Sequence, residues 1–194
     1  MTKIKLALFA SGSGSNAINI IDHFSNHPSV EIGFVLSNKQ EAPIVEKAKL
    51  KGVKVLVFSN DEVADGNFLS KVCLENEIHF IVLAGYLRKI PAELLQNYAE
   101  KMINVHPALL PKFGGQGMYG NNVHKAVLEA KENETGITIH FVNEHFDEGR
   151  MIAQFHCALN NTDTVESIQA KVQNLEHAYF PIVIEKTILA NWQF

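Results

Sequence analysis

Two polar side chains stand two positions apart at the end of a short apolar run, Ile103-Asn104-Val105-His106-Pro107. Residues i and i+2 of a strand point to the same face of a sheet, so we expect Asn104 and His106 to lie side by side. An amide donor next to an imidazole, the side chain that titrates nearest to neutral pH, suits a carbonyl group that must be polarised and then protonated. In the alternative interpretation, His106 only ends a strand and Asn104 only begins a turn.

A glycine-rich loop follows the first apolar segment of the chain. Residues 3–10 are predicted to form a buried strand, Ser11-Gly12-Ser13-Gly14-Ser15-Asn16 a loop, and residues 17–24 a helix. Small residues at a helix N-terminus let backbone N–H groups approach an anion, and the helix dipole favours negative charge there. We therefore expect this loop to bind a single phosphate group.

Two other interpretations of the loop are open. It can be only a tight turn between a strand and a helix, or it can bind a dinucleotide, because Gly12, Gly14 and Ala17 fit the pattern G-x-G-x-x-A. A dinucleotide site also needs an acidic residue after the second strand. The strand predicted over residues 30–36 is followed instead by Ser37-Asn38-Lys39.

Two further segments are candidates for a site. Asp147 lies in a turn that could reach back to the edge of the sheet, where a carboxylate would orient an imidazole and stabilise its cationic form; an ordinary turn is the alternative. Residues 83–91 end a strand in a small-residue loop with apolar Leu87 and Ile90. A flat apolar ligand could lie on that loop, although simple core packing would explain the same residues.

Strand and helix patterns alternate in the first part of the chain. Strands are predicted over residues 3–10, 30–36, 53–58, 80–84 and 102–105, and helices over 17–24, 42–51 and 68–75, with a short helix opening at Pro91. This alternation predicts a parallel sheet with helices on both faces. Ligands of such sheets bind at the carboxyl ends of the strands, so we expect the glycine-rich loop and the Asn104–His106 pair to face one crevice.

The pattern changes after about residue 112. A glycine-rich segment over residues 113–122 precedes a helix over 123–130, strands over 136–142 and 151–158, and a long helix over 164–189 that Pro181 kinks or breaks. The predicted fold class is α/β, a Rossmann-like open, mostly parallel sheet with helices on both faces and an antiparallel or mixed C-terminal portion. We expect one domain over residues 1–194.

Composition argues against several classes of protein. The 194 residues suffice for one domain with a sizeable core, and a net charge of -4 leaves no electrostatic footprint for nucleic acid. No apolar run is long enough for a membrane span, and the N-terminus lacks the layout of a signal peptide. The histidines lack metal-ligand spacing. We expect a cytoplasmic protein with no metal, no nucleic-acid partner and no membrane partner, as a monomer or weak homodimer.

Together the motifs resemble the folate-dependent formyltransferases over nearly the whole chain. The resemblance rests on residues 12–16, 35–39, 83–88, 104–112, 140–142, 147–149 and 176–181, in this order. It implies transfer of a formyl group from the co-substrate 10-formyltetrahydrofolate to the amine of glycinamide ribonucleotide in purine biosynthesis, with no metal. A deformylase that uses water as acceptor, whose N-terminal regulatory domain has no room before Lys3, and a non-catalytic nucleotide-binding module are the alternatives.

The resemblance also implies a role for each matching residue. The catalytic trio would be Asn104, His106 and Asp147. The substrate phosphate would bind Gly14, Ser15 and Asn16, and the glycinamide and ribose would lie near Glu176. The folate would contact Leu87, Arg88, Lys89, Ile90, Asn104 and the loop over residues 140–147. The phosphate-binding half would thus be about residues 1–100, and the catalytic and folate-binding half about residues 101–194.

The chain departs from the family pattern just past Lys112. The glycine-rich stretch from Phe113 to Asn122 stands where the family has a short Pro-Gly and a helix start like His-Thr-His, and only the second of those histidines is kept, as His124.

Overall fold

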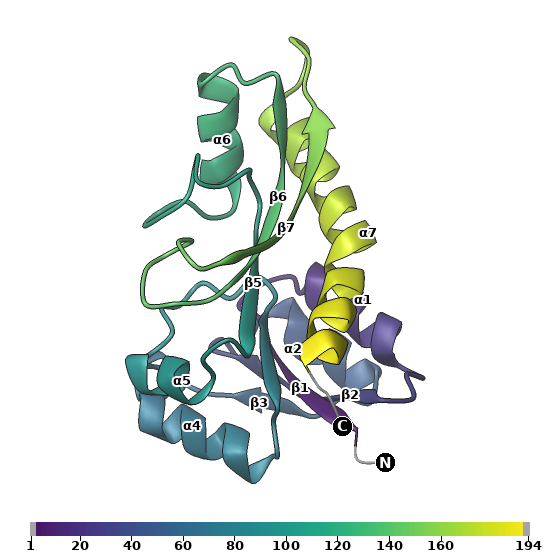
Figure 1. The fold of residues 1–194 in the computed structure, drawn as a ribbon, viewed down its shortest axis with the longest axis vertical. Helices are drawn as coiled ribbons and strands as arrows, with labels where there is room; N and C mark the ends of the chain where they lie inside the picture. Colours follow the sequence, from purple (N-terminus) through teal and green to yellow (C-terminus); the bar gives the residue numbers. More distant parts are fainter. Residues whose placement is uncertain (1–2, 192–194) are drawn as a thin grey trace. The chain divides into compact units, whose positions relative to one another are not determined.

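The computed structural model describes residues 3–191 and divides into two compact units, Met1–Ile103 and Asn104–Phe194. Figure 1 shows the course of the chain and the element labels. Of the helices in the described part of the chain, none has the length and apolar character that a bilayer crossing requires.

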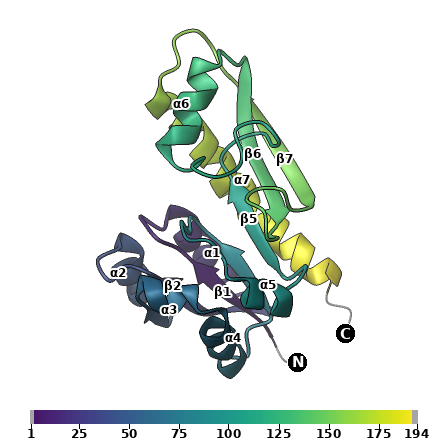
Figure 2. The same ribbon diagram turned by 90° about the vertical axis from the view of Figure 1, so that its left-hand side faces the viewer.

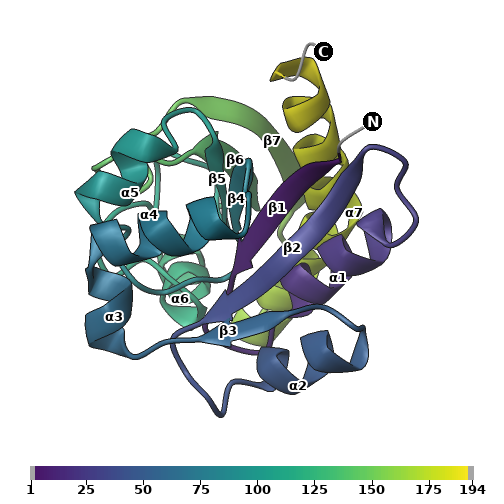
Figure 3. The same ribbon diagram turned by 90° about the horizontal axis from the view of Figure 1, so that it is seen from below.

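The first unit is a parallel sheet with helices on both faces (Figure 3). Its strands are β1 (Ile4–Phe9), β2 (Val30–Ser37), β3 (Val55–Val57) and β4 (Phe80–Leu83). They lie in the order β3-β2-β1-β4, followed by the start of β5 (Met102–His106), and the pairs that β1 forms with β2 and β4 and that β2 forms with β3 are parallel. The helices are α1 (Ser15–Phe24), α2 (Pro43–Leu50), α3 (Asn60–Ala64), α4 (Gly66–Glu75) and α5 (Ala92–Asn97).

Strand β1 lies inside this sheet. Its residues Leu6, Ala7, Leu8 and Phe9 are completely buried, because a parallel strand covered on both faces is apolar along its whole length rather than at alternate positions. Strand β1 lies between β2 and β4, so the loops that follow β1 and β4 leave the sheet side by side. The strand order reverses between these two strands, and open α/β sheets bind their ligands at such a point.

The second unit is an antiparallel hairpin packed on a long helix (Figures 1 and 2). It contains the end of β5, then α6 (Asn121–Glu129), β6 (Glu134–Phe141), β7 (Met151–Ala158) and α7 (Val165–Asn191). Helix α7, yellow in Figure 1, runs along both strands. Its buried side chains are Ile168, Val172, Phe180, Ile184 and Ile188.

The fold class predicted from the sequence is confirmed: the strands are mostly parallel, the last pair is antiparallel and helices flank the sheet. The sequence predicts a kink or a break at Pro181. The break does not occur, because α7 continues as one helix on both sides of the proline. The buried Phe180 and Ile184 beside it hold this part of the helix on the sheet.

Helix α3 was not predicted, although the sequence carries its signal. Ser59 accepts a hydrogen bond from the N–H of Glu62, and the Glu62 carboxylate accepts one from the N–H of Ser59. This reciprocal capping box starts helices even when they are short. The pattern Ser-x-x-Glu therefore predicts a helix start at this position.

Candidate active site

The glycine-rich loop lies in the first unit, between β1 and α1. Gly14 has φ 71°, and a Cβ atom at this position would overlap the side chain of Ile44. Only glycine fits such a left-handed, crowded position without strain. Helix α1 therefore begins at Ser15, not at residue 17 as predicted. Its N-terminal N–H groups donate no hydrogen bond to a capping side chain at Gly14.

A lysine that the sequence reasoning missed lies beside this loop. The ammonium group of Lys47, on α2, donates a hydrogen bond to the carbonyl oxygen of Ser13 at 3.0 Å. The N–H of Ile44, also on α2, donates to the carbonyl of Gly12 at 3.3 Å. Helix α2 thus forms two hydrogen bonds with the loop and places a positive charge beside it.

A buried hydroxyl connects three loops of the first unit. The Oγ atom of Ser11 donates to Oδ1 of Asn38 at 2.7 Å and accepts from the N–H of Leu87 at 3.1 Å. The amide group of Asn38 donates in turn to Oδ1 of Asn60 at 2.9 Å. Ser11 is only 3% exposed, so its hydrogen bond to Asn38 forms away from water. Together the hydrogen bonds of Ser11 fix the loops after β1, β2 and β4 against one another.

The predicted folate segment forms the loop between β4 and α5. Leu87, Arg88 and Lys89 are exposed, whereas Ile90 is buried. The preceding Tyr86 is buried with its ring edge-on to Phe9, and burial raises the pKa of Tyr86 to about 12. The segment therefore exposes the side chains of Leu87, Arg88 and Lys89 to solvent, and the buried residues on either side, Tyr86 and Ile90, fix its position.

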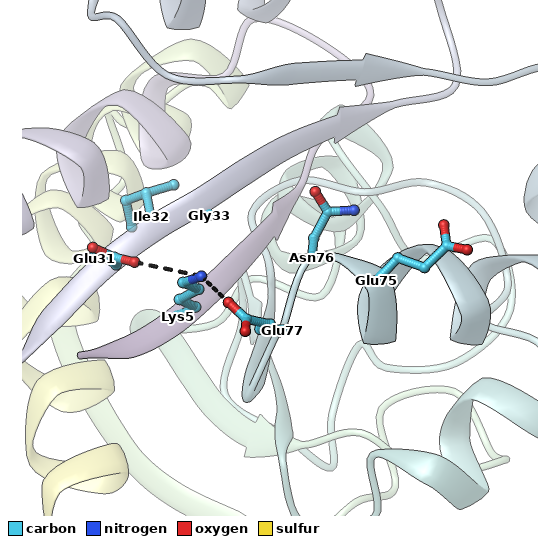
Figure 4. A pocket seen from close by; sticks show the side chains of 7 residues that line it. All are labelled: Lys5, Glu31, Ile32, Gly33, Glu75, Asn76 and Glu77. Atoms are coloured by element: carbon cyan, nitrogen blue, oxygen red, sulfur yellow. Dashed lines mark hydrogen bonds and ion pairs between the residues drawn. The ribbon is translucent and has the colours of Figure 1, made fainter. Parts of the chain in front are cut away.

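A separate polar hollow of about 380 Å³ occurs in the first unit (Figure 4). Its lining residues are Lys5, Glu31, Ile32, Gly33, Glu75, Asn76 and Glu77. The ammonium group of Lys5 already contacts the carboxylates of Glu31 and Glu77. None of the predicted site residues lines this hollow, and Lys5 stands near the amino end of β1, away from the strand ends where such sheets bind ligands.

In the second unit, the structure brings His106 and Asp147 together. His106 ends β5 and is 3% exposed. Its Nδ1 atom lies 3.3 Å from Oδ2 of Asp147, and its Nε2 atom lies 2.8 Å from the carbonyl oxygen of Phe113. Both ring nitrogens thus face acceptor oxygens, an arrangement that suits an imidazolium ion.

His140, on β6, completes the cluster and was predicted only as one end of a folate-contacting loop. Its Nδ1 atom lies 2.8 Å from the carbonyl of Phe141, an acceptor, so Nδ1 carries the proton. Nε2 is then free to accept from the amide group of Asn104 at 3.3 Å. The same Nε2 lies 3.6 Å from Oδ1 of Asp147. His140 therefore orients the Asn104 amide beside the His106–Asp147 pair.

Asp147 is held in an ionised state. Burial alone would raise its pKa, but the contact with the imidazole of His106 and the hydrogen bond from the N–H of Gly115 at 3.0 Å outweigh burial and hold the pKa of Asp147 well below its usual range. Its backbone has φ 60°, which aspartate tolerates better than most residues. The turn predicted at this position thus delivers a carboxylate to the cluster.

Hydrogen bonds from β6 and β7 fix the segment that follows His106. Oγ1 of Thr138 donates to the carbonyl of Ala108 at 2.7 Å and accepts from the N–H of Leu110 at 2.9 Å. The amide of Gln154 donates both to the carbonyl of Leu110 and to Thr138 Oγ1, each at 2.9 Å. The strand end that carries His106 is therefore held rigidly by its neighbours.

Similarity to known proteins identifies the family of this chain. The model of the family described as "Formyl transferase" matches residues 4–184, which is most of the chain. The chain belongs to the formyl transferase family.

Several relatives of this formyl transferase chain carry one name. A protein of Arabidopsis thaliana named phosphoribosylglycinamide formyltransferase, chloroplastic, is 41% identical over 93% of this chain and 64% of its own length. A phosphoribosylglycinamide formyltransferase of Bacillus subtilis is 33% identical over 96% of both chains. The crystal structure of phosphoribosylglycinamide formyltransferase from Anaplasma phagocytophilum superposes with a TM-score of 0.86 at 29% identity, over 95% of this chain and 86% of that one. A protein of the same name from Vigna unguiculata is 38% identical over 93% of this chain and 60% of its own length. The chain therefore spans less than two thirds of the length of both plant relatives.

Two other predicted positions lie in the second unit of this formyl transferase chain. Glu176 lies partly buried in the middle of α7. His124, on α6, is 4% exposed, and its pKa is lowered by burial and by the charge of His106. Within residues 3–191, no group of three or more histidine, cysteine, aspartate or glutamate side chains is arranged to hold a metal ion.

Proposed function

We propose that this chain is a phosphoribosylglycinamide formyltransferase. It transfers the formyl group of 10-formyltetrahydrofolate to the amine of N1-(5-phospho-D-ribosyl)glycinamide, a step of de novo purine biosynthesis. The observation that carries the proposal is the polar cluster of the second unit, in which an amide, two buried imidazoles and an ionised carboxylate lie within 3.6 Å of their neighbours. Membership of the formyl transferase family and the relatives' shared name support it.

The amide of Asn104 and the protonated ring of His106 stabilise the oxyanion. When the neutral amine attacks the formyl carbon, a C–N bond forms and negative charge develops on the formyl oxygen. One N–H of Asn104 is directed to His140, so the second can donate to this oxygen. A fixed donor of this kind contributes about 3 kcal/mol to transition-state stabilisation.

The His106–Asp147 pair moves the proton. Protonated His106 gives a proton to the folate nitrogen as the bond from that nitrogen to the formyl carbon breaks, and its ring, then neutral, takes up the proton that the amine nitrogen must lose. Asp147 stabilises the imidazolium form, because it is ionised and 3.3 Å away. The reaction needs no covalent intermediate with the enzyme.

The remaining predicted residues bind the two substrates. Gly14, Ser15 and Asn16 hold the phosphate at the start of α1, where backbone N–H groups have no capping side chain at Gly14, and Lys47 adds a positive charge beside them. Glu176 contacts the glycinamide and ribose. The folate lies against Asn104 and the exposed segment Leu87, Arg88, Lys89 and Ile90. Binding energy from these distant groups positions the amine for attack.

An absorbance assay for tetrahydrofolate formation tests this function. Purified protein with formyl folate should turn over only when glycinamide ribonucleotide is present. Equal rates with and without this acceptor would indicate a hydrolase that uses water, and no turnover under either condition would indicate a binding module. His106→Ala and Asp147→Asn should each lower kcat by about 100-fold, the scale of acid–base groups, and near-normal kcat in both would remove their proposed roles.

The location and assembly of the protein stay predictions. We propose a cytoplasmic enzyme that acts as a monomer or weak homodimer on small molecules alone, without metal, nucleic acid or membrane. Two of the similar plant proteins are named chloroplastic. Fractionation of the native cells and sedimentation of the purified protein test these two points.

A further inference from the structure

One face of strand β6 holds the main chain on both sides of His106. His140 accepts a hydrogen bond from the amide group of Asn104, two residues before His106, at 3.3 Å. Thr138 donates to the carbonyl oxygen of Ala108, two residues after His106, at 2.7 Å. Residues two apart on a strand point to the same face of a sheet, so both contacts come from one face of β6. The imidazole of His106 therefore lies between two points that this strand fixes.

The hydroxyl group of Thr138 uses its full hydrogen-bonding capacity. A hydroxyl donates one hydrogen bond and accepts two. Thr138 donates to Ala108 and accepts from the N–H of Leu110 and from the amide of Gln154, each at 2.9 Å. The Gln154 amide also donates to the carbonyl oxygen of Leu110 at 2.9 Å. Because Thr138 is completely buried, water does not readily replace a partner that its hydroxyl loses.

Gln154 reaches this position because of the pairing between β6 and β7. Thr138 and Gln154 stand directly opposite each other in the antiparallel register, where side chains on neighbouring strands are close enough to interact. Gln154 therefore supports Thr138 from the side and holds Leu110 directly. Two side chains on two strands thus fix the turn that follows His106.

The short connection between Ala108 and His106 transmits this support to the imidazole. Pro107 is the one residue between them, and its ring fixes the backbone angle φ. Nδ1 of His106 lies 3.3 Å from Oδ2 of Asp147, at the long end of hydrogen-bond distances. A small displacement of Ala108 would therefore take the imidazole out of reach of the carboxylate.

We propose that Gln154 and Thr138 are positioning residues for formyl transfer, which keep the ring of His106 in contact with Asp147. This inference rests on the proposed function and deepens it, because Asp147 stabilises the protonated form of His106. Both residues act through the main chain and not through the substrates. Loss of either should lower kcat, which depends on the His106–Asp147 pair, and leave KM nearly unchanged.

Two residues on the same face of β7 provide a matched pair of variants. Gln154→Leu removes the hydrogen bonds to Thr138 and Leu110. His156→Leu makes the same replacement two residues further along, where the exposed imidazole only faces Glu134 at 3.2 Å. Gln154→Leu should lower kcat about tenfold, the scale of a lost hydrogen bond, with KM for both substrates within about twofold. His156→Leu should change neither constant.

Thr138→Val and Thr138→Ser test the hydroxyl group itself. Thr138→Val keeps the shape of the side chain without the hydroxyl and should lower kcat by about tenfold or more. Thr138→Ser keeps the hydroxyl and should recover most of this loss. Equal kcat in these two variants, equal kcat in Gln154→Leu and His156→Leu, or a change confined to KM would each overturn the proposal. If urea unfolding shows that Thr138→Val does not fold, the β7 pair decides.

A double-mutant cycle shows whether Gln154 acts through Asp147. In Asp147→Asn the contact that Gln154 protects is already changed, so adding Gln154→Leu should lower kcat by less than about twofold further. A further tenfold loss would mean that Gln154 affects the reaction by another route, and the proposal would fail.

Nuclear magnetic resonance separates this proposal from the proposed function. In long-range ¹H–¹⁵N spectra of protein labelled in its histidine rings, the His106 signals are identified by their loss in His106→Gln. They should shift in Gln154→Leu and stay in place in His156→Leu. Unmoved signals in Gln154→Leu would overturn the proposal. If the unmodified enzyme forms no product from either acceptor, the proposed function fails, whereas this measurement still decides whether Gln154 positions the ring.

Discussion

At the scale of single residues, Asp147 contacts the most members of the candidate site. Its carboxylate faces His106 and His140 and accepts the N–H of Gly115. A carboxylate that is partly buried and yet ionised depends on such contacts, so its removal affects the fold as well as the reaction.

The low pKa of Asp147 makes the stability of the protein depend on pH. The pKa is lower in the folded chain than its unfolded value of about 3.9, so the ionised carboxylate stabilises the fold above about pH 4, and this contribution is lost as the pH falls towards the folded value. Asp147→Asn should be less stable than the unmodified protein by about 1–3 kcal/mol at pH 7. The difference should shrink steadily below about pH 4, as measured by urea unfolding from pH 7 to 2.

Glu148→Gln is the matched control for this measurement, because Glu148 is the adjacent, exposed acid. It should unfold like the unmodified protein at every pH. A stability difference for Asp147→Asn that stayed constant from pH 7 to 2 would show that the carboxylate is not the cause.

Within the site, the residues that share one strand could be predicted and those on different strands could not. Asn104 and His106 follow from the two-residue period of β5 alone. His140 belongs to β6, and its approach to Asn104 depends on the register between strands, which a single sequence does not reveal. Asp147 could be only a candidate, because its approach depends on a backbone with φ 60°.

At the scale of secondary-structure elements, alternation and apolar runs were enough to predict the order of the elements other than α3. The ends of the helices were harder to predict, since they depend on tertiary contacts. Helix α1 begins at Ser15 because Gly14 packs against Ile44. The hydrogen bonds of Ser11 to Asn38 and Leu87 join loops that are far apart in sequence, and no local pattern indicates them.

The relative position of the loops after β1 and β4 should depend on the hydroxyl group of Ser11. Ser11→Ala leaves the N–H of Leu87 and Oδ1 of Asn38 without this partner, so the proposed folate segment loses a fixed point. KM for formyl folate should rise about tenfold, corresponding to about 1.4 kcal/mol for one lost hydrogen bond, while kcat at saturation changes little. Steady-state kinetics with each substrate varied in turn measures both constants.

Ser37→Ala controls for the removal of a buried hydroxyl. Ser37 is completely buried at the end of β2, and its Oγ atom forms local hydrogen bonds with the backbone of Lys39, two residues away. Ser37→Ala should leave KM for formyl folate unchanged. If both variants raised this KM equally, the connection through Ser11 would not be the cause.

At the scale of the whole molecule, the overall charge does not favour the substrates. The chain has a formal net charge of -4, and both a phosphorylated ribose and a folate are anions. Long-range attraction therefore cannot guide them, and local cations have to hold them. That the glycine-rich loop and the Asn104–His106 pair face one crevice, within one domain, stays a prediction.

Binding of glycinamide ribonucleotide should stabilise the whole chain, and Lys47 should contribute to this effect. A ligand at 100 times its Kd adds about 2.7 kcal/mol to the free energy of unfolding. Lys47 lies beside the phosphate loop but is exposed, so its loss in Lys47→Met should raise Kd about threefold, the scale of a solvent-exposed ion pair. At the same ligand concentration the gain then falls to about 2.1 kcal/mol, and the gap should close in 1 M salt. Lys49→Met is the control, because it removes another exposed lysine of the same helix, one that pairs with Glu46 at 3.8 Å. This variant should retain the full gain in stability. An equal loss in both variants would mean that helix α2, not the position of Lys47, determines the affinity.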